Sequence, residues 1–184
     1  MAFEFKECGM LGLYEIEPKV YEDGRGCFFE SYNERDFCDA GITERFVQDN
    51  QSFSTKGVLR GLHFQKTCPQ AKLVRAVQGR VFDVVVDLRK DSPTFGKWHG
   101  VILDANRRNQ LYVPKGFAHG FLALEDAVFA YKCSDFYHPE DERGVIWNDS
   151  VIGIDWPKIA GGLNPTLSEK DKLHPSFDSL KDCL

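Results

Sequence analysis

The segment Val81–Leu88, Val-Phe-Asp-Val-Val-Val-Asp-Leu, carries the clearest strand pattern in the chain. Side chains alternate between the two faces of a strand, so one face of this segment is entirely apolar and the other carries Asp83 and Asp87 around Val85. A strand with one apolar face and one acid-bearing face suits a barrel with a polar lumen. The segment therefore predicts a β-structure built around a partly polar interior.

Short strands with turn signals continue on both sides of this segment. Lys72–Gln78 precedes it across Gly79-Arg80, which predicts a hairpin turn with Gly79 at positive φ. Gly120–Leu124 and Val128–Cys133 predict a second hairpin around Glu125-Asp126. Evenly spaced short strands of this kind are typical of closed or sandwiched all-β folds.

Helical signals are confined to short segments at the periphery. Asn33 can cap a helix over Glu34–Ala40 that ends at Gly41. The tail from Asn164 to Leu184 has an irregular or helical pattern. The sequence thus predicts an all-β fold, and residues 1–184 are expected to form a single domain because a chain of 184 residues is too short for two comfortable cores.

Charge and cysteine usage exclude several classes of partner. The formal net charge is −5 and the pI is about 5.5, so binding of nucleic acid through bulk charge is not expected. No apolar run is long enough to span a bilayer, and the N-terminus has no signal-peptide pattern. Six cysteines without a CxxC pair predict free, mostly buried thiols and a cytoplasmic location.

The stretch Gly57–Gln65 is unusual because it sets Arg60 and His63 in an otherwise apolar strand. Gly61 in the strand interior predicts a bulge or a close approach of another group, and a bulge would turn Arg60 towards the face that carries His63. A single histidine in a strand is more often a hydrogen-bonded core residue than a catalyst. A catalytic role for His63 is therefore favoured only if other apolar strands also contain titratable side chains.

Three further apolar strands each contain a titratable side chain, namely Lys72, His119 and Tyr131. Burial of such groups is expensive unless they are paired or used chemically. Together they indicate that His63 is the centre of an acid–base site. Asp83 is expected to pair with Lys72 and hold it charged.

Seven motifs, in this order along nearly the whole chain, carry a family resemblance: Gly57–Gln65, Pro114–Phe121, Tyr131–Cys133, Tyr137–Glu142, Trp147–Asp149, Gly153–Pro157 and Leu167–Asp171. With these motifs the chain resembles the dTDP-4-dehydrorhamnose 3,5-epimerases. The resemblance implies an isomerase with a cupin-type jelly-roll fold that acts as a homodimer without metal or other cofactor. It also implies inversion of C3 and C5 of dTDP-4-dehydro-6-deoxy-D-glucose, giving dTDP-4-dehydro-L-rhamnose in dTDP-L-rhamnose biosynthesis.

The resemblance assigns the chemical roles to four residues. His63 matches the general base, Asp171 its carboxylate partner and Tyr131 the acid, while Lys72 matches the residue near the C4 oxygen. A base and an acid on opposite faces of the sugar are what inversion requires. Ser168–Asp171 also matches a helix-capping signal, which would give Asp171 a purely structural role.

Nine more positions match substrate contacts in the family: Arg25, Glu30, Gln48, Asn50, Arg60, His119, Tyr137, Glu142 and Lys170. Tyr137 falls on the ring that stacks against thymine. Asp49 is as good a candidate for contact as its neighbours Gln48 and Asn50. The family also implies that the segment from Arg25 to Glu30 crosses to the neighbouring subunit.

Other functions compete with this interpretation. A related enzyme inverting only C3 or only C5 is the nearest alternative, followed by a non-catalytic sugar-nucleotide binding protein. A metal-dependent cupin oxygenase is disfavoured because Gln65 stands where the second imidazole of the metal motif would be. His99, His138 and His174 are interpreted as structural or exposed, with nothing beside them that builds a site.

Overall fold

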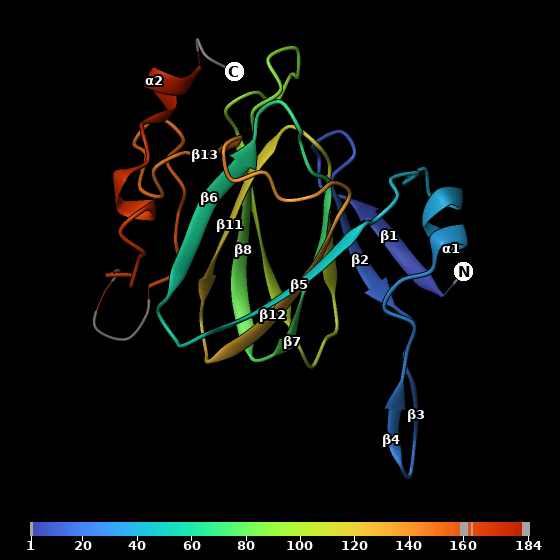
Figure 1. Ribbon diagram of the computed structural model, residues 1–184. Coiled ribbons are helices and arrows are strands. Elements are labelled where there is room, and N and C mark those ends of the chain that lie inside the picture. The colour runs from blue at the N-terminus through green and yellow to red at the C-terminus, as the bar shows by residue number, and fades with distance from the viewer. Residues whose placement is uncertain (1, 159–161, 163, 182–184) are drawn as a thin grey trace.

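The computed structural model describes residues 2–158, 162 and 164–181. Most of its regular elements are strands (Figure 1). In chain order they are β1 (Phe3–Glu7), β2 (Tyr14–Pro18), β3 (Tyr21–Asp23), β4 (Gly26–Phe28), α1 (Glu34–Asp39), β5 (Gln48–Ser54), β6 (Leu59–Gln65), β7 (Lys72–Gln78), β8 (Arg80–Asp87), β9 (Trp98–Asp104), β10 (Gln110–Val113), β11 (Phe117–Ala123), β12 (Ala127–Cys133), β13 (Glu142–Gly144), the 3-10 helix η1 (Asp171–Leu173) and α2 (Phe177–Leu180).

All described strands except β3 and β4, which form a two-stranded sheet of their own, belong to two antiparallel sheets that pack face to face. The larger sheet has the order β1-β2-β10-β7-β12-β5, and the smaller sheet has the order β13-β6-β11-β8-β9. An apolar core between them contains Val74, Leu111 and Phe129 from the larger sheet and Val85 and Phe121 from the smaller one. The predicted all-β jelly roll with short peripheral helices is therefore confirmed.

The predicted hairpins are wrong, although the turns lie where the sequence places them. Gly79 has φ +70°, but β7 pairs with β10 and β12 while β8 pairs with β9 and β11. β11 and β12 likewise belong to different sheets. A jelly roll carries successive strands from one sheet to the other, and the turn residues needed for that crossing are the same as those of a hairpin.

The outer face of the smaller sheet is covered by the C-terminal segment. Val84 and Val86 of β8 pack there against Ile152, Trp156 and Phe177. Each fully buried apolar side chain of this size stabilises the fold by about 1.5–3 kcal/mol. The apolar face of the strand thus holds the tail on the sheet, and the other face directs Asp83 into the interior, as the alternation predicts.

The helix α1 begins at the predicted cap. The side chain of Asn33 accepts hydrogen bonds from the backbone N–H groups of Arg35, at 3.1 Å, and Asp36, at 3.4 Å. Phe37 is fully buried, with its ring 5.2 Å from that of Phe3. The helix therefore packs on the outer side of the larger sheet, away from the interior between the sheets.

The β3–β4 hairpin projects away from both sheets (Figure 1). Its aromatic side chains are exposed, Tyr21 by 54% and Phe28 by 68%. Arg25 at its turn is 91% exposed and pairs with Asp23 of the same hairpin. A projecting hairpin with exposed aromatic residues has the character of an arm that packs on another surface.

The cysteine prediction is only half right. Cys8, Cys27, Cys38, Cys68 and Cys133 are free thiols, but only Cys133 among these five is buried. Cys183 lies outside the described residues. Within the part of the chain that the structure describes, no helix has the length and apolarity needed to cross a membrane.

Candidate active site

A bulge at Gly61 shapes the strand that carries His63. In the pairing of β6 with β11, His63 lies opposite His119 and Arg60 opposite Phe121, so β6 has one residue more than β11 in this interval. Gly61 has φ +125°, and a Cβ there would lie 2.6 Å from the Cα of Gly120. The predicted bulge is present, the close neighbour is the backbone of β11, and Arg60 and His63 reach the same cavity.

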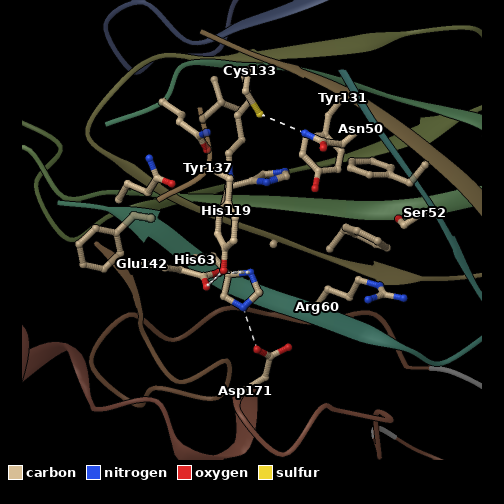
Figure 2. Close-up of a pocket in the computed structure, with 18 of the residues that line it drawn as sticks. Asn50, Ser52, Arg60, His63, His119, Tyr131, Cys133, Tyr137, Glu142 and Asp171 are labelled. Carbon is tan, nitrogen blue, oxygen red and sulfur yellow. Dashed lines mark hydrogen bonds and ion pairs between the residues drawn. The ribbon is translucent and has the colours of Figure 1, made fainter. Parts of the chain in front are cut away.

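That cavity lies between the two sheets and has a volume of about 630 Å³ (Figure 2). It is bounded by β5, β7 and β12 of the larger sheet, by β6 and β11 of the smaller sheet, and by the tail at η1. The sequence-predicted residues among its lining are Gln48, Asn50, Arg60, His63, Lys72, His119, Tyr131, Tyr137, Glu142, Lys170 and Asp171.

His63 and Asp171 form a hydrogen-bonded pair at the tail side of the cavity (Figure 2). His63 Nε2 lies 2.7 Å from Asp171 Oδ1, and the backbone N–H of Gly61 donates to Asp171 Oδ2 at 3.4 Å. Ser168 Oγ accepts the N–H of Asp171 at 3.1 Å. The capping signal therefore uses the Asp171 backbone, which leaves its carboxylate for His63.

Asp171 is held as a carboxylate by its neighbours. Burial alone would raise its pKa, but the adjacent imidazoles of His174 and His63 and the N–H of Gly61 outweigh burial and place the pKa well below its usual value. An anion at Nε2 favours the tautomer that carries its proton there. His63 Nδ1, 4.0 Å from Glu142 Oε1, is then left with a free lone pair.

Asp83 pairs with His119 rather than with Lys72. His119 Nε2 lies 3.0 and 2.9 Å from the two carboxylate oxygens of Asp83. Asp83 and His119 are diagonal neighbours on β8 and β11, whereas Lys72 belongs to the opposite sheet. The expected Lys72–Asp83 ion pair is therefore not formed, and burial raises the pKa of Asp83.

Lys72 and Tyr131 face the cavity from the larger sheet. Within the described residues the Lys72 amino group has no hydrogen-bond partner, and burial lowers its pKa, opposed by the charges of Cys133, Asp83 and Glu142. Burial raises the pKa of Tyr131, so its phenol stays protonated at neutral pH. The cavity thus has the Lys72 amino group and the Tyr131 phenol on the wall opposite His63.

A polar cluster around Glu142 lies at the mouth of the cavity. Tyr137 Oη donates to Glu142 Oε2 at 2.7 Å, and Lys170 pairs with the same carboxylate. Burial alone would raise the pKa of Glu142, but these two hydrogen bonds outweigh it and lower the pKa. Gln48 Oε1 accepts the backbone N–H of Tyr137 at 3.0 Å, which fixes the half-exposed ring beside the opening.

The structure separates the two candidates left open on β5. Asn50 lines the cavity and donates from Nδ2 to Cys133 Sγ at 3.6 Å, as Figure 2 shows. Asp49 lies on the other face of the strand and pairs with Lys132 at 2.8 Å. Alternation along β5 therefore favours Gln48 and Asn50 as the contacting residues.

Two predicted contact residues do not reach this cavity. Arg25 is at the tip of the projecting hairpin, and Glu30 accepts a hydrogen bond from Asn33 Nδ2 at 2.8 Å beside α1. Neither lines the cavity of its own chain. A role for them requires the cavity of a second copy.

His174 lies beside Asp171, although its sequence context indicated only a structural or exposed residue. Its Nε2 lies 3.4 Å from Asp171 Oδ1, and its ring packs edge-on against that of His63 with centroids 5.4 Å apart. The interpretation that nothing beside His174 builds a site is therefore wrong. The spacing from Asp171 to His174, three residues in a possible helical turn, was the available signal.

An aspartate-bound imidazole, a lysine amino group and a phenol around one cavity of a jelly roll are typical of a cupin-type enzyme of acid–base chemistry. Comparison with known proteins specifies this class further. The family described as dTDP-4-dehydrorhamnose 3,5-epimerase matches residues 7–179. A dTDP-4-dehydrorhamnose 3,5-epimerase of Shigella flexneri is 56% identical over 159 residues, which are 85% of this chain and 86% of that protein.

Two further relatives are also described as 3,5-epimerases of dTDP-linked sugars. A dTDP-4-dehydrorhamnose 3,5-epimerase of Methanothermobacter thermautotrophicus is 52% identical over 172 residues, 92% of each chain. The crystal structure of a dTDP-6-deoxy-D-glucose-3,5-epimerase from Legionella pneumophila in complex with dTDP-4-keto-L-rhamnose superposes with a TM-score of 0.91 at 48% identity, covering 96% of this chain and 93% of that one. The chain belongs to the dTDP-4-dehydrorhamnose 3,5-epimerase family, as its motifs predict, and is an isomerase.

Proposed function

We propose that this chain inverts C3 and C5 of dTDP-4-dehydro-6-deoxy-D-glucose to give dTDP-4-dehydro-L-rhamnose, in the biosynthesis of dTDP-L-rhamnose. The observation that carries the proposal is the 2.7 Å pair of His63 Nε2 and Asp171 Oδ1 in a cavity that Tyr131 enters from the other sheet. No cofactor is required, because the C4 ketone of the substrate itself acidifies the hydrogens on C3 and C5.

Proton removal is assigned to His63 Nδ1. Its free lone pair takes the hydrogen next to the ketone, and the Asp171 carboxylate stabilises the imidazolium that forms. The electron pair left behind delocalises onto the C4 oxygen as an enolate. Lys72 is assigned to that oxygen, where a cation in a dry site lowers the barrier by about 3–4 kcal/mol.

Proton return is assigned to Tyr131. Inversion needs the new proton to arrive on the face opposite the base, and Tyr131 stands on β12 while His63 stands on β6 of the facing sheet. Burial raises the pKa of Tyr131, so the phenol still carries its proton at neutral pH and can give it to the carbanion, which is a far stronger base. Each inversion leaves His63 as an imidazolium and Tyr131 as a tyrosinate, and proton exchange with solvent returns both to their starting forms before the second carbon reacts and again before the next turnover.

The remaining cavity residues are assigned to binding. Arg60, held by Ser54 Oγ at 3.0 Å, suits the pyrophosphate because a guanidinium binds phosphate in a bidentate manner. The exposed face of Tyr137 suits stacking on thymine. Gln48, Asn50, His119, Glu142 and Lys170 supply further polar contacts to sugar and nucleotide.

A homodimer would complete the site with Arg25 and Glu30 of the neighbouring copy. This part of the proposal is supported by the exposed aromatic residues of the β3–β4 hairpin and by Phe53 and Val77, which are 57% and 43% exposed on the outer face of the larger sheet. Apolar side chains exposed on both the arm and the sheet fit a mutual contact between copies. The free thiols fit a reducing cytoplasm.

One incubation tests the chemistry. The protein is given dTDP-4-dehydro-6-deoxy-D-glucose in deuterated water, and the products are followed by NMR. Deuterium at both C3 and C5 with formation of the L-rhamno product is the expected result. Deuterium at one carbon alone would identify a single-centre epimerase, and no exchange at either carbon would reject the assignment.

Mixing two inactive variants tests the dimer. Arg25→Ala removes the contributed arginine, and His63→Ala removes the base. If each site combines the two chains, a co-expressed mixture regains up to about a quarter of wild-type activity, since half the dimers are mixed and each has one intact site. A mixture of His63→Ala with Asp171→Asn is the control, because both changes fall in the same chain's site and no activity returns. Equal activity in both mixtures would contradict the shared site.

A further inference from the structure

His63, Asp171 and His174 form a compact cluster that catalysis does not fully explain. One ligand-type atom from each lies within 4.8 Å of those from the other two. Asp171 Oδ1 is shared, at 2.7 Å from His63 Nε2 and at 3.4 Å from His174 Nε2. A general base needs one carboxylate partner, so the second imidazole is surplus to that role.

The His174 ring lies buried beside Asp171, with Nε2 outside the geometry of a hydrogen bond. Its side chain is only 8% exposed, and among the described residues its buried Nε2 has no hydrogen-bond partner. A Cβ at position 144 would overlap the His174 ring, so Gly144 provides the space in which the ring lies. Because an unsatisfied buried nitrogen is costly, its direction towards Asp171 requires an explanation.

The donor set matches a transition ion. Two imidazoles and one carboxylate suit divalent zinc, cobalt or nickel. Around a tetrahedral ion with bonds of about 2.0–2.1 Å, neighbouring ligand atoms are about 3.3 Å apart. The cluster spacings of 2.7, 3.4 and at most 4.8 Å bracket that value. His63 and Asp171 also line the cavity, so an ion can enter and keep water as a further ligand.

We propose that His63, Asp171 and His174 form an inhibitory site for a divalent transition-metal ion, with zinc as the best-suited ion. The inhibitory part rests on the proposed role of His63 as base. Neutral imidazole has one proton and one lone pair. Base catalysis at Nδ1 needs the proton on Nε2, directed to Asp171, whereas an ion at Nε2 needs the lone pair there and moves the proton to Nδ1. Metal binding and proton removal therefore exclude one another.

Binding is tested with Co²⁺ alone, which reports its ligands by visible absorption and needs no turnover. Wild type is expected to bind one Co²⁺ with nitrogen and oxygen ligands, and His174→Gln is expected to bind at least about tenfold more weakly. His138→Gln removes an imidazole elsewhere and Cys133→Ser removes the thiol in the cavity, so neither should change the spectrum. Equal Co²⁺ affinity in wild type and His174→Gln, or an intense thiolate band lost in Cys133→Ser, would overturn the site.

Inhibition is measured separately as the ratio of turnover with and without Zn²⁺. Wild type is expected to lose activity reversibly, with recovery on adding a chelator, and His174→Gln to need at least about tenfold more Zn²⁺. If His174→Gln does not fold, Asp171→Asn replaces it in the Co²⁺ titration and should also bind weakly. Co²⁺ binding without Zn²⁺ inhibition would retain the metal site while rejecting His63 as the base. Inhibition equal in both proteins would reject the proposal.

Discussion

Two histidines of the cavity, His63 and His119, are each paired with an aspartate, and the two pairs differ in their surroundings rather than in their residue types. His63 and His119 lie opposite each other on β6 and β11, and each meets its aspartate through Nε2 at 3.0 Å or less. The His63 side chain is 27% exposed and its aspartate comes from the tail. His119 is 8% exposed, and Asp83 is fully buried in the neighbouring strand.

The pKa values of the two carboxylates are shifted in opposite directions by their surroundings. Hydrogen bonds and nearby imidazoles lower the pKa of Asp171 despite burial, whereas burial raises the pKa of Asp83 despite His119. Asp171 therefore stabilises an imidazolium at little cost, while the interior around Asp83 disfavours charge. In the proposed mechanism, the same two residue types therefore give a base at His63 and a positioning pair at His119.

The largest effect is expected for the two histidines themselves. His63→Ala should lower kcat by about 10³-fold and abolish the exchange of substrate hydrogens with deuterated water, because it deletes the group to which proton removal is assigned. Nucleotide binding should be nearly intact. His119→Ala should slow exchange by only about tenfold, mainly through weaker binding. Faster exchange in His63→Ala than in His119→Ala would reverse the two roles.

Removing the acid opposite the two histidines is expected to have the next largest effect. Tyr131→Phe should lower the rate of product formation by about 10²-fold, since it deletes the donor but not the base. Deuterium should still enter the substrate at C3 or C5 in this variant. Product formation as fast as in wild type would show that the acid is another group.

Substitution of the two aspartates should show the same contrast with smaller losses of kcat. The loss should be larger for Asp171 than for Asp83. Asp171→Asn keeps the shape of the side chain but removes the anion that stabilises the imidazolium, so kcat should fall by about 10²-fold. Asp83→Asn should lower kcat by less than about tenfold. Steady-state kinetics of the two variants side by side measures the contrast, and equal losses would mean that both pairs act alike.

The smallest effect is expected in stability as a function of pH. The pKa of Asp171 is lowered by folding, so its contribution is complete above about pH 4 and is lost as the pH falls further. The pKa of Asp83 is raised, so its contribution is complete below about pH 4 and is lost as the pH rises through the folded value.

Thermal unfolding between pH 3 and pH 8 should therefore separate the variants. At pH 7, Asp171→Asn should be less stable than wild type by about 2 kcal/mol, with a weaker loss of stability in acid. Asp83→Asn should be as stable as wild type or more stable at pH 7. A large loss of stability in Asp83→Asn at neutral pH would show that its charge is needed for the fold.

Local patterns in the sequence predicted strands, the Asn33 cap and the bulge at Gly61 because each depends on neighbouring residues. They did not reveal that β7 and β8 belong to different sheets, since a crossing and a hairpin use the same turn residues. The pairing of Asp83 with His119 was missed for a related reason. It depends on which strands are neighbours, and alternation along one strand contains no information about that.

The site was predictable where motifs and resemblance specified it and not where the tail is involved. His63, Tyr131 and Lys72 stand on strands whose alternation directs them inward. His174 reaches the site only because the tail packs on the smaller sheet through Trp156 and Phe177. That packing joins segments far apart in the sequence, and no local pattern encodes it.

The carboxylate that serves His63 lies 108 residues further along the chain. During translation, every strand of both sheets leaves the ribosome before Asp171 does, so a nascent chain can build the jelly roll while its base still lacks a partner. The same order makes the last segment vulnerable, because cleavage and release of the tail after Trp156 would take Asp171 from His63 and Phe177 from the outer face of the smaller sheet. In the proposed mechanism, activity therefore requires that the tail has been synthesised and that it is still attached.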